Sequence, residues 1–213
     1  MIYNIDIAKQ VAKSLLQINA IILQPKHPFK WAAGWNSPIY CDNRKTLSYP
    51  EIRNNIRQGL AAIVRNHYKG ANVIAGVATA GIPHGALVAE ELGLPFIYVR
   101  SKAKEHGKQN QIEGYFEKGQ SVILVEDLIS SGKSSLDAAA TLKEAGMQVK
   151  GMVSIFTYGF DAATENFKNA NCEYVPLCDY NTLLPEAIKS QYIEQADLSM
   201  LKEWRKNPAM WKK

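Results

Sequence analysis

The chain contains 213 residues, of which 46% are hydrophobic and 21% are charged. This composition is typical of a globular domain large enough to bury a full core, and it excludes disordered and fibrous proteins. Lysine and arginine outnumber aspartate and glutamate by 25 to 20, and the net charge of +5 fits an anionic small substrate as well as a nucleic acid.

The sequence lacks the marks of a membrane or secreted protein. Its apolar runs are far shorter than the roughly 20 residues that a membrane-spanning helix needs. Residues 1–10 include Asp6 and have no basic segment followed by an apolar stretch, so we expect no secretory signal. The three cysteines, Cys41, Cys172 and Cys178, form no C-x-x-C pair, which argues against a disulfide framework and a zinc site. We therefore predict a cytoplasmic protein with no membrane partner and no metal held by protein ligands.

The N-terminal part of the chain predicts two helices on either side of an irregular lobe. Asn4 can cap the first helix, because apolar residues recur after it at helical spacing. Residues 24–44 are rich in proline, glycine and tryptophan around a short apolar segment, which indicates a turn-rich, hood-like lobe. The second helix should begin near Ser48, with Pro50 in its first turn, and extend to Gly70. The apolar stripes of the two helices are Ala8, Val11, Ala12, Leu15 and Leu16, and Ile52, Ile56, Leu60, Ile63 and Val64.

From residue 72 onward, apolar strands alternate with helices. The predicted strands are 72–77, 96–100, 121–126 and 149–157, and the predicted helices are 83–92 and 133–145. Strands without polar alternation, separated by helices, are typical of a parallel sheet that is covered on both faces. Ligands bind such sheets at the carboxyl ends of the strands, so the segments that follow those ends are the candidate site.

Residues 122–134 carry the strongest chemical signal. Four apolar residues lead directly to Glu126 and Asp127, which we expect at the end of a strand. Neighbouring side chains leave a strand in opposite directions, so the two acids could hold different parts of a polyhydroxylated ligand, or water bound to a metal ion. The residues that follow precede a helix, and their N–H groups, hydroxyls and helix dipole together form a phosphate cradle. The cradle residues are Ser130, Ser131, Gly132, Lys133, Ser134 and Ser135.

Other interpretations of these segments are less favoured. An ordinary strand-to-helix turn with a serine cap is the simplest alternative to the cradle. Gly132, Lys133 and Ser134 match the end of a Walker A loop, but its earlier glycine would fall at Asp127. The spacing of the glycines at 76, 81 and 85 does not match the G-x-G-x-x-G of a dinucleotide site.

Residues 122–134 resemble the signature of the type I phosphoribosyltransferases, which bind phosphoribosyl pyrophosphate (PRPP). The resemblance implies that Glu126 and Asp127 hold the ribose hydroxyls and that the loop holds the 5′-phosphate. The PRPP-binding residues of this segment would be Glu126, Asp127, Leu128, Ile129, Ser130, Ser131, Gly132, Lys133 and Ser134. The implied Mg²⁺ is bound through PRPP and water rather than by a protein cage.

Residues 100–114 form a basic segment after a predicted strand. A solvated charged loop is the simplest interpretation, but the R-x-x-x-K-x-H-G pattern is similar to the catalytic loop of orotate phosphoribosyltransferases. The pattern falls on Arg100, Lys104, His106 and Gly107. The resemblance implies that this lid closes over the diphosphate leaving group, with Arg100, Lys104 and His106 binding PRPP and with Lys104, His106 and Asp127 as the catalytic residues. Ser101 stands where many members have a second lysine.

Two further segments extend the resemblance. Residues 76–85 are similar to the diphosphate-binding loop, with Thr79 and Gly81 on PRPP, although Ala80 stands where relatives often carry lysine and a tight turn packed for structure is the alternative. Residues 31–44 resemble the hood over the pyrimidine in bacterial orotate phosphoribosyltransferases. The lysine that some relatives place before the hood glycine, and the arginine that others place after residue 157, are both missing. The implied orotate-binding residues are Ser130, Tyr40, Cys41 and Arg44, with a surface role as the alternative for Arg44.

These observations predict an α/β enzyme with the type I phosphoribosyltransferase fold, a mainly parallel sheet with helices on both faces plus a small N-terminal hood lobe. We expect one domain over residues 1–213, with the hood built from about 20–45 and the C-terminal region, whose Trp204 and Trp211 should pack on the body. The resemblance implies transfer of phosphoribosyl from PRPP to orotate in a homodimer that shares its lids and binds no nucleic acid. The alternatives are a purine phosphoribosyltransferase and a PRPP-sensing regulator that binds nucleic acid through its basic tail.

Overall fold

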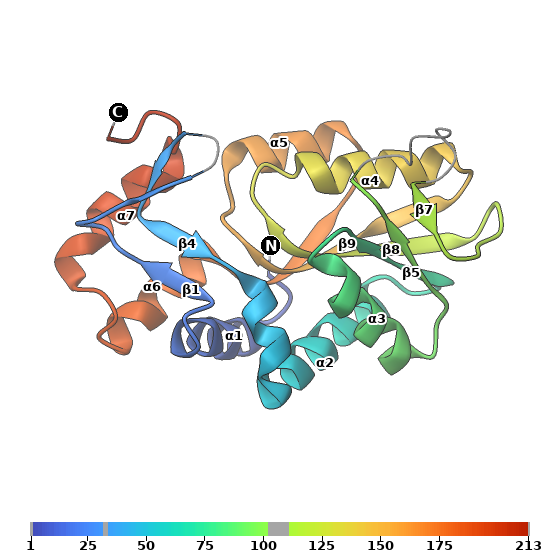
Figure 1. Cartoon of the computed structure of the whole chain (residues 1–213), viewed down its shortest axis with the longest axis horizontal. Coiled ribbons are helices and arrows are strands. Elements are labelled where there is room, and N and C mark those ends of the chain that lie inside the picture. The colour runs from blue at the N-terminus through green and yellow to red at the C-terminus, as the bar shows by residue number, and fades with distance from the viewer. Residues whose placement is uncertain (1, 32–33, 102–110, 213) are drawn as a thin grey trace.

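The computed structural model describes residues 2–31, 34–101 and 111–212. Its centre is a six-stranded sheet in the order β10-β9-β8-β5-β6-β7, in which only β7 is antiparallel to its neighbour (Figure 1). The strands are β5 (Val73–Val77), β6 (Phe96–Val99), β7 (Ile112–Glu113), β8 (Ser121–Ile129), β9 (Gln148–Thr157) and β10 (Tyr174–Asp179). The central strand β8 is therefore flanked by β5 and β9, and its carboxyl end lies near the middle of the sheet.

Helices cover both faces of the sheet, as continuous apolar strands require. One core packs side chains such as Ile74 and Ile123 against α1 (Ile5–Gln17), α2 (Pro50–His67) and α3 (Gly81–Leu92). The other packs their strand neighbours Val73 and Val122 against α4 (Lys133–Glu144) and α5 (Asp161–Asn169). Figure 1 shows the first three helices on one side of the sheet and α4 and α5 on the other.

A second group of elements forms the hood beside the sheet. β1 (Ile21–Leu23) pairs with β4 (Ile39–Cys41), and β2 (Phe29–Lys30) pairs with β3 (Asn36–Ser37), both antiparallel. The short helix η1 (Asn43–Ser48) leads from β4 into α2, and the C-terminal helices α6 (Tyr180–Lys189), η2 (Gln195–Asp197) and α7 (Leu198–Lys206) lie next to these strands (Figure 1).

Trp204 of α7 joins the hood to the sheet. It is fully buried, and its ring lies edge-on to Trp31 of the hood at 5.7 Å and to Tyr158 after β9 at 5.7 Å. Such edge-to-face contacts add to the stabilisation that burial of large aromatic surfaces provides. The expected packing of Trp204 and Trp211 on the body is confirmed, because both are buried.

The structure confirms the elements predicted between residues 4 and 157, with small changes of boundary. Asn4 accepts hydrogen bonds from the N–H groups of Asp6 and Ile7, and the five predicted apolar residues of α1 are its buried residues. The largest difference is at β8, which was predicted to end at Glu126 but extends to Ile129, so Asp127 also lies within the strand and the acid pair is not at its end. Among the residues that the structure describes, no helix is long and apolar enough to cross a membrane.

Candidate active site

Glu126 and Asp127 lie on the part of β8 that extends beyond β5, since the pairing of these strands ends at Gly76 and Val125. Glu126 is buried, and its Oε1 accepts the N–H of Asp127 at 3.0 Å while its Oε2 accepts the hydroxyl of Ser135 at 2.8 Å. Asp127 is half-buried. Each carboxyl group also shifts the pKa of the other, a coupling that alternation along the strand did not predict.

The surroundings of this acid pair favour its protonated forms. Burial raises the pKa of Glu126 well above its usual range, and the neighbouring Asp127 raises it further. Burial also raises the pKa of Asp127, although hydrogen bonds and the positive charge of Arg44 partly oppose this shift. An acid pair that is costly to ionise in the free protein is a typical feature of a binding or catalytic site, where a cationic or hydroxylated ligand relieves the cost.

The loop after β8 has the features of an anion cradle. Gly132 is the N-cap residue of α4 and has a left-handed φ of +77°, and no side chain caps the helix. Outside the N-cap position, the hydroxyl of Ser131 accepts the N–H of Lys133 at 3.5 Å, which is part of the serine-capped alternative, and the next N–H groups of the first turn are available to an anion. Ser131, Lys133 and Ser134 are exposed beside it. The expectation for Ser135 was wrong, because α4 has already begun there and the buried hydroxyl faces Glu126 instead of the cradle.

Neighbouring elements hold this loop in place. Asn166 of α5 donates its side-chain N–H to the carbonyl of Ser131 at 3.0 Å. The hydroxyl of Thr157 and the N–H of Tyr158, at the end of β9, both donate to the carbonyl of Ile129. A Cβ built on Gly132 would lie 2.4 Å from the ring of Phe167, so α5 also leaves room only for glycine.

The second predicted segment lies against the acid strand. The turn at residues 78–80 connects β5 to α3, and Thr79 is exposed there. A Cβ on Gly81 would lie 2.4 Å from the carbonyl oxygen of Val125 and 3.3 Å from the Cα of Glu126, so the absence of a side chain lets the start of α3 contact β8. Ala78, Arg100 and Ser134 line one cavity of about 90 Å³, which brings this turn, the root of the lid and the cradle together.

Arg100 lies at the root of the lid, just after β6. Its N–H donates to the carbonyl of Gln111 at 2.8 Å and its guanidinium contacts Glu113 at 3.4 Å, so residues 100 and 111 close the base of the predicted loop. The other lid residues of the prediction, Lys104 and His106, lie outside the described residues.

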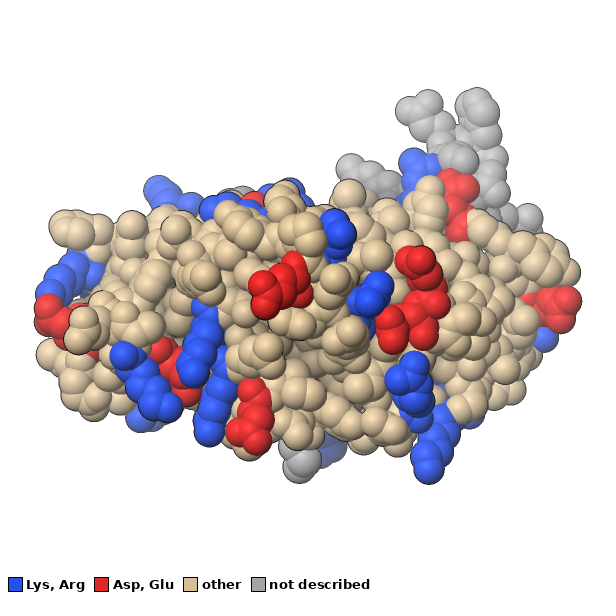
Figure 2. All heavy atoms as spheres, turned by 90° about the horizontal axis from the view of Figure 1, so that it is seen from below, with Lys and Arg blue, Asp and Glu red and all other residues tan. Residues whose placement is uncertain are grey.

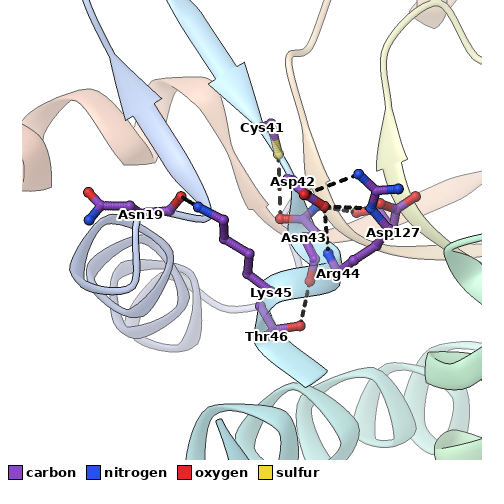
Figure 3. Close-up of polar contacts among 8 residues, drawn as sticks. All are labelled: Asn19, Cys41, Asp42, Asn43, Arg44, Lys45, Thr46 and Asp127. Carbon is purple, nitrogen blue, oxygen red and sulfur yellow. Dashed lines mark hydrogen bonds and ion pairs between the residues drawn. The ribbon is translucent and has the colours of Figure 1, made fainter. Parts of the chain in front are cut away.

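The hood brings its predicted residues to the other side of Asp127. Tyr40 is exposed and Cys41 is half-buried at the end of β4. Arg44 forms two hydrogen bonds with the carboxylate of Asp42, at 2.6 Å and 3.1 Å, and Figure 3 shows its guanidinium beside Asp127. The side chain of Arg44 is exposed, and its charge lowers the pKa of Asp127.

Sequence reasoning missed one contact that joins hood and sheet. The Nδ2 of Asn43 donates to the carbonyl of Asp127 at 2.7 Å, across 84 positions of the chain. A lone asparagine in a turn-rich segment carries no periodic signal, so only the fold could reveal this partner. Where relatives place an arginine after residue 157, the structure has buried Tyr158 next to Trp31 and Phe160.

The packing of the cradle against α5 can be tested with two glycines of nearly equal φ. Gly132 (φ +77°) faces Phe167, whereas Gly70 (φ +79°) has no atom within 4 Å of a built Cβ. Gly70→Ala should lower the free energy of unfolding by about 1 kcal/mol, the usual cost of a left-handed alanine. Gly132→Ala should lower it by about 1–3 kcal/mol more, because the ring of Phe167 must move. Equal losses in denaturant unfolding would show that α5 does not constrain the loop.

The burial of Glu126 predicts a pH-dependent stability. Because the pKa of Glu126 is raised in the folded protein, its contribution to stability is present at low pH and is lost as the pH rises. Glu126→Gln removes this loss. The free energy of unfolding of the variant, relative to that of the wild type, should therefore rise by on the order of 1 kcal/mol from about pH 4 to about pH 8. Urea unfolding at the two pH values measures this difference. If the difference in the free energy of unfolding between the two proteins is the same at both pH values, Glu126 ionises freely in the folded chain.

Comparisons with known proteins agree with this geometry. Residues 47–181 match the family model described as a phosphoribosyl transferase domain. The chain is 57% identical over 205 residues to the orotate phosphoribosyltransferase of Cytophaga hutchinsonii, and the match covers 96% of this chain and 98% of that protein. It is 53% identical over 204 residues to the orotate phosphoribosyltransferase of Bacillus subtilis, and that match covers 95% of this chain and 94% of that protein. The crystal structure of orotate phosphoribosyltransferase from Aeropyrum pernix aligns with a TM-score of 0.75 at 26% identity, covering 86% of this chain and 99% of that one. The chain belongs to the type I phosphoribosyltransferase family and, within it, to the orotate phosphoribosyltransferases.

Proposed function

We propose that this protein transfers the phosphoribosyl group of PRPP to orotate, giving orotidine 5′-monophosphate and diphosphate in pyrimidine biosynthesis. The observation that carries the proposal is the convergence of four parts at one place. The acid pair on β8 and the N-terminus of α4, which follows that strand, lie between the turn at 78–81 and the hood. This arrangement fits a ligand that has a phosphate, a sugar and a flat base.

Each part of PRPP would meet a different segment. Glu126 and Asp127 would hold the ribose hydroxyls, and the cradle from Leu128 to Ser134 would bind the 5′-phosphate through N–H groups and the helix dipole. Thr79, Gly81 and Arg100 would bind the diphosphate, together with Lys104 and His106 of the lid. Because Ala80 and Ser101 stand at two positions where relatives carry lysine, backbone N–H groups of the 78–81 turn would carry more of the diphosphate binding here.

The base would lie under the hood, against Tyr40, Cys41 and Ser130. We assign the orotate carboxylate to Arg44, a cation of the hood whose charge lowers the pKa of Asp127. In the free protein Asp42 accepts from two of the three nitrogens of that guanidinium, Nε and Nη2, so orotate would replace Asp42 as the carboxylate partner or share the guanidinium with it. The aromatic side chain of Tyr158 takes the place of the missing arginine.

The acid pair fits a Mg²⁺ that is carried by PRPP and water. Two carboxyl groups whose pKa values are raised would ionise more readily beside a divalent cation, and Asp127 is accessible enough to accept hydrogen bonds from its water. Bound in this way, the ion would offset the charge of the diphosphate.

The residues themselves would act by position and charge. Departure of diphosphate leaves positive charge on the anomeric carbon, which the carboxylate of Asp127 is placed to stabilise through the ribose. Lys104 and His106 would stabilise the charge on the diphosphate and exclude water while the lid is closed. No covalent nucleophile is needed, because holding base and sugar in contact supplies much of the rate enhancement.

The substrate assignment is tested by measuring diphosphate release with PRPP, Mg²⁺ and one of four bases: orotate, uracil, adenine or hypoxanthine. Orotate should be consumed, with loss of its ultraviolet absorbance, and the other bases should give little release. Asp127→Asn should lower turnover with orotate by about a hundredfold or more while the protein stays folded. Turnover of a purine instead would favour the purine phosphoribosyltransferase, and PRPP binding without turnover of any base would favour the regulator.

The face of the molecule that carries α1, α2 and α3 gives little support to the alternative of a regulator that binds nucleic acid. Figure 2 shows basic and acidic side chains interspersed on the face seen there. Arg57 of α2 is paired with Glu91 of α3 at 3.1 Å, which neutralises one of these basic groups. A nucleic-acid surface would instead require basic residues gathered on one face.

We further propose that residues 1–213 form one domain and that the enzyme works in the cytoplasm as a homodimer in which each lid completes the partner's site. The test is to unfold and refold together two inactive variants, Lys104→Ala and Asp127→Asn. Random pairing makes half of the dimers mixed, and each mixed dimer has one whole site of two, so about a quarter of the native activity should return. If each lid served its own chain, the mixture would stay at the level of the single variants.

A further inference from the structure

We propose that Asn43 is a positioning residue that fixes the base-binding hood relative to the strand that holds the ribose. The inference rests on the proposed function, since it concerns how the two halves of that site are held together. Asn43 is fully buried at the start of η1, directly after the hood strand β4 and next to Arg44. Its side chain forms a hydrogen bond that links this segment of the hood to Asp127 (Figure 3).

The contacts of Asn43 fix the orientation of its amide. A backbone carbonyl can only accept, so the Nδ2 must face Asp127, where the distance is 2.7 Å. Its Oδ1 is then left to accept from the Sγ of Cys41 at 3.4 Å. The thiol can donate because burial, with Asp127 and Asp42 nearby, raises the pKa of Cys41. One amide therefore connects Cys41, which faces the base in the proposed site, to the residue that holds the ribose.

The segment around Asn43 is itself held by side chains. Its carbonyl accepts the hydroxyl of Thr46 at 2.6 Å, and the ammonium of Lys45 donates to the carbonyl of Asn19 at 2.9 Å (Figure 3). Asp42 pairs with Arg44. These contacts hold the turn in place, and the buried amide of Asn43 therefore fixes the hood relative to β8.

This link matters most on the side of β8 that has lost its neighbour. The pairing with β5 ends at Val125, two positions before Asp127, while the pairing with β9 continues to Ile129. On the side that β5 leaves open, the acid-bearing end of β8 therefore depends on other contacts for its position. The glycosidic bond forms only when the base nitrogen and the anomeric carbon approach to about 3–3.5 Å, and a displacement of about 1 Å can cost a hundredfold in rate. Removing the amide should therefore affect a ligand that spans both halves far more than a ligand that occupies one.

The experiment compares Asn43→Leu and the smaller Asn43→Ser with the control Thr46→Val. The control removes a buried hydrogen bond of the same turn but leaves the contact between Asn43 and Asp127. The full-length proteins are tested for turnover of orotate, and calorimetry gives their affinities for PRPP and for orotidine 5′-monophosphate. Thermal unfolding of each variant shows how much of the fold is lost.

In the Asn43 variants, kcat should fall about tenfold to a hundredfold and orotidine 5′-monophosphate should bind about tenfold more weakly, while PRPP affinity changes by less than about threefold. Thr46→Val should keep kcat within about threefold at a comparable loss of melting temperature. Three outcomes would overturn the inference and leave the proposed function intact. The Asn43 variants could lose affinity equally for PRPP and orotidine 5′-monophosphate, they could keep kcat as the control does, or both could fail to fold. A wild type that neither turns over orotate nor binds the nucleotide would overturn both.

Discussion

The difficulty that this fold resolves is the presence of two adjacent carboxyl groups on the central strand of a buried sheet. Moving a charged carboxylate out of water is costly unless donors or cations compensate for the lost hydration. Around Glu126 and Asp127 these compensating groups come from every side: the hydroxyl of Ser135 from α4, the N–H of Asp127 itself, and the charge of Arg44 from the hood. Two of these contacts also fix neighbouring elements beside β8, since Ser135 belongs to α4 and Arg44 belongs to the hood.

The same contacts explain which parts of the site could be predicted from sequence. Continuous apolar strands, the cap at Asn4 and the run at 122–134 are local patterns, and each gave an element or a segment that the structure contains. The start of α4 at Lys133 was predicted, but the partner of the Ser135 hydroxyl is Glu126 of β8, and a local pattern does not show which strand side chain a residue of the first helical turn faces. The bond from Asn43 to Asp127 joins residues 84 positions apart and leaves no trace in either segment.

The C-terminal elements escaped prediction for a different physical reason. The edge strand β10 contains Pro176 and helix α6 contains Pro185, and proline weakens the sequence signal of both kinds of element. Proline is tolerated in β10 because the strand lies at the edge of the sheet, with β9 as its only neighbour in the described sheet. The helix around Pro185 is held by its buried face, which includes Leu183, Leu184 and Ala187.

The position of Trp204 in the chain also sets the order in which the protein can mature on the ribosome. The hood strands at residues 21–41 emerge early, but the indole that packs against Trp31 and Tyr158 is made only after the last strand of the sheet, β10. The parallel sheet, by contrast, is complete once residue 179 has emerged. The strand that carries the acid pair and the loop that follows it are therefore synthesised together with the whole parallel sheet before the hood receives its aromatic partner.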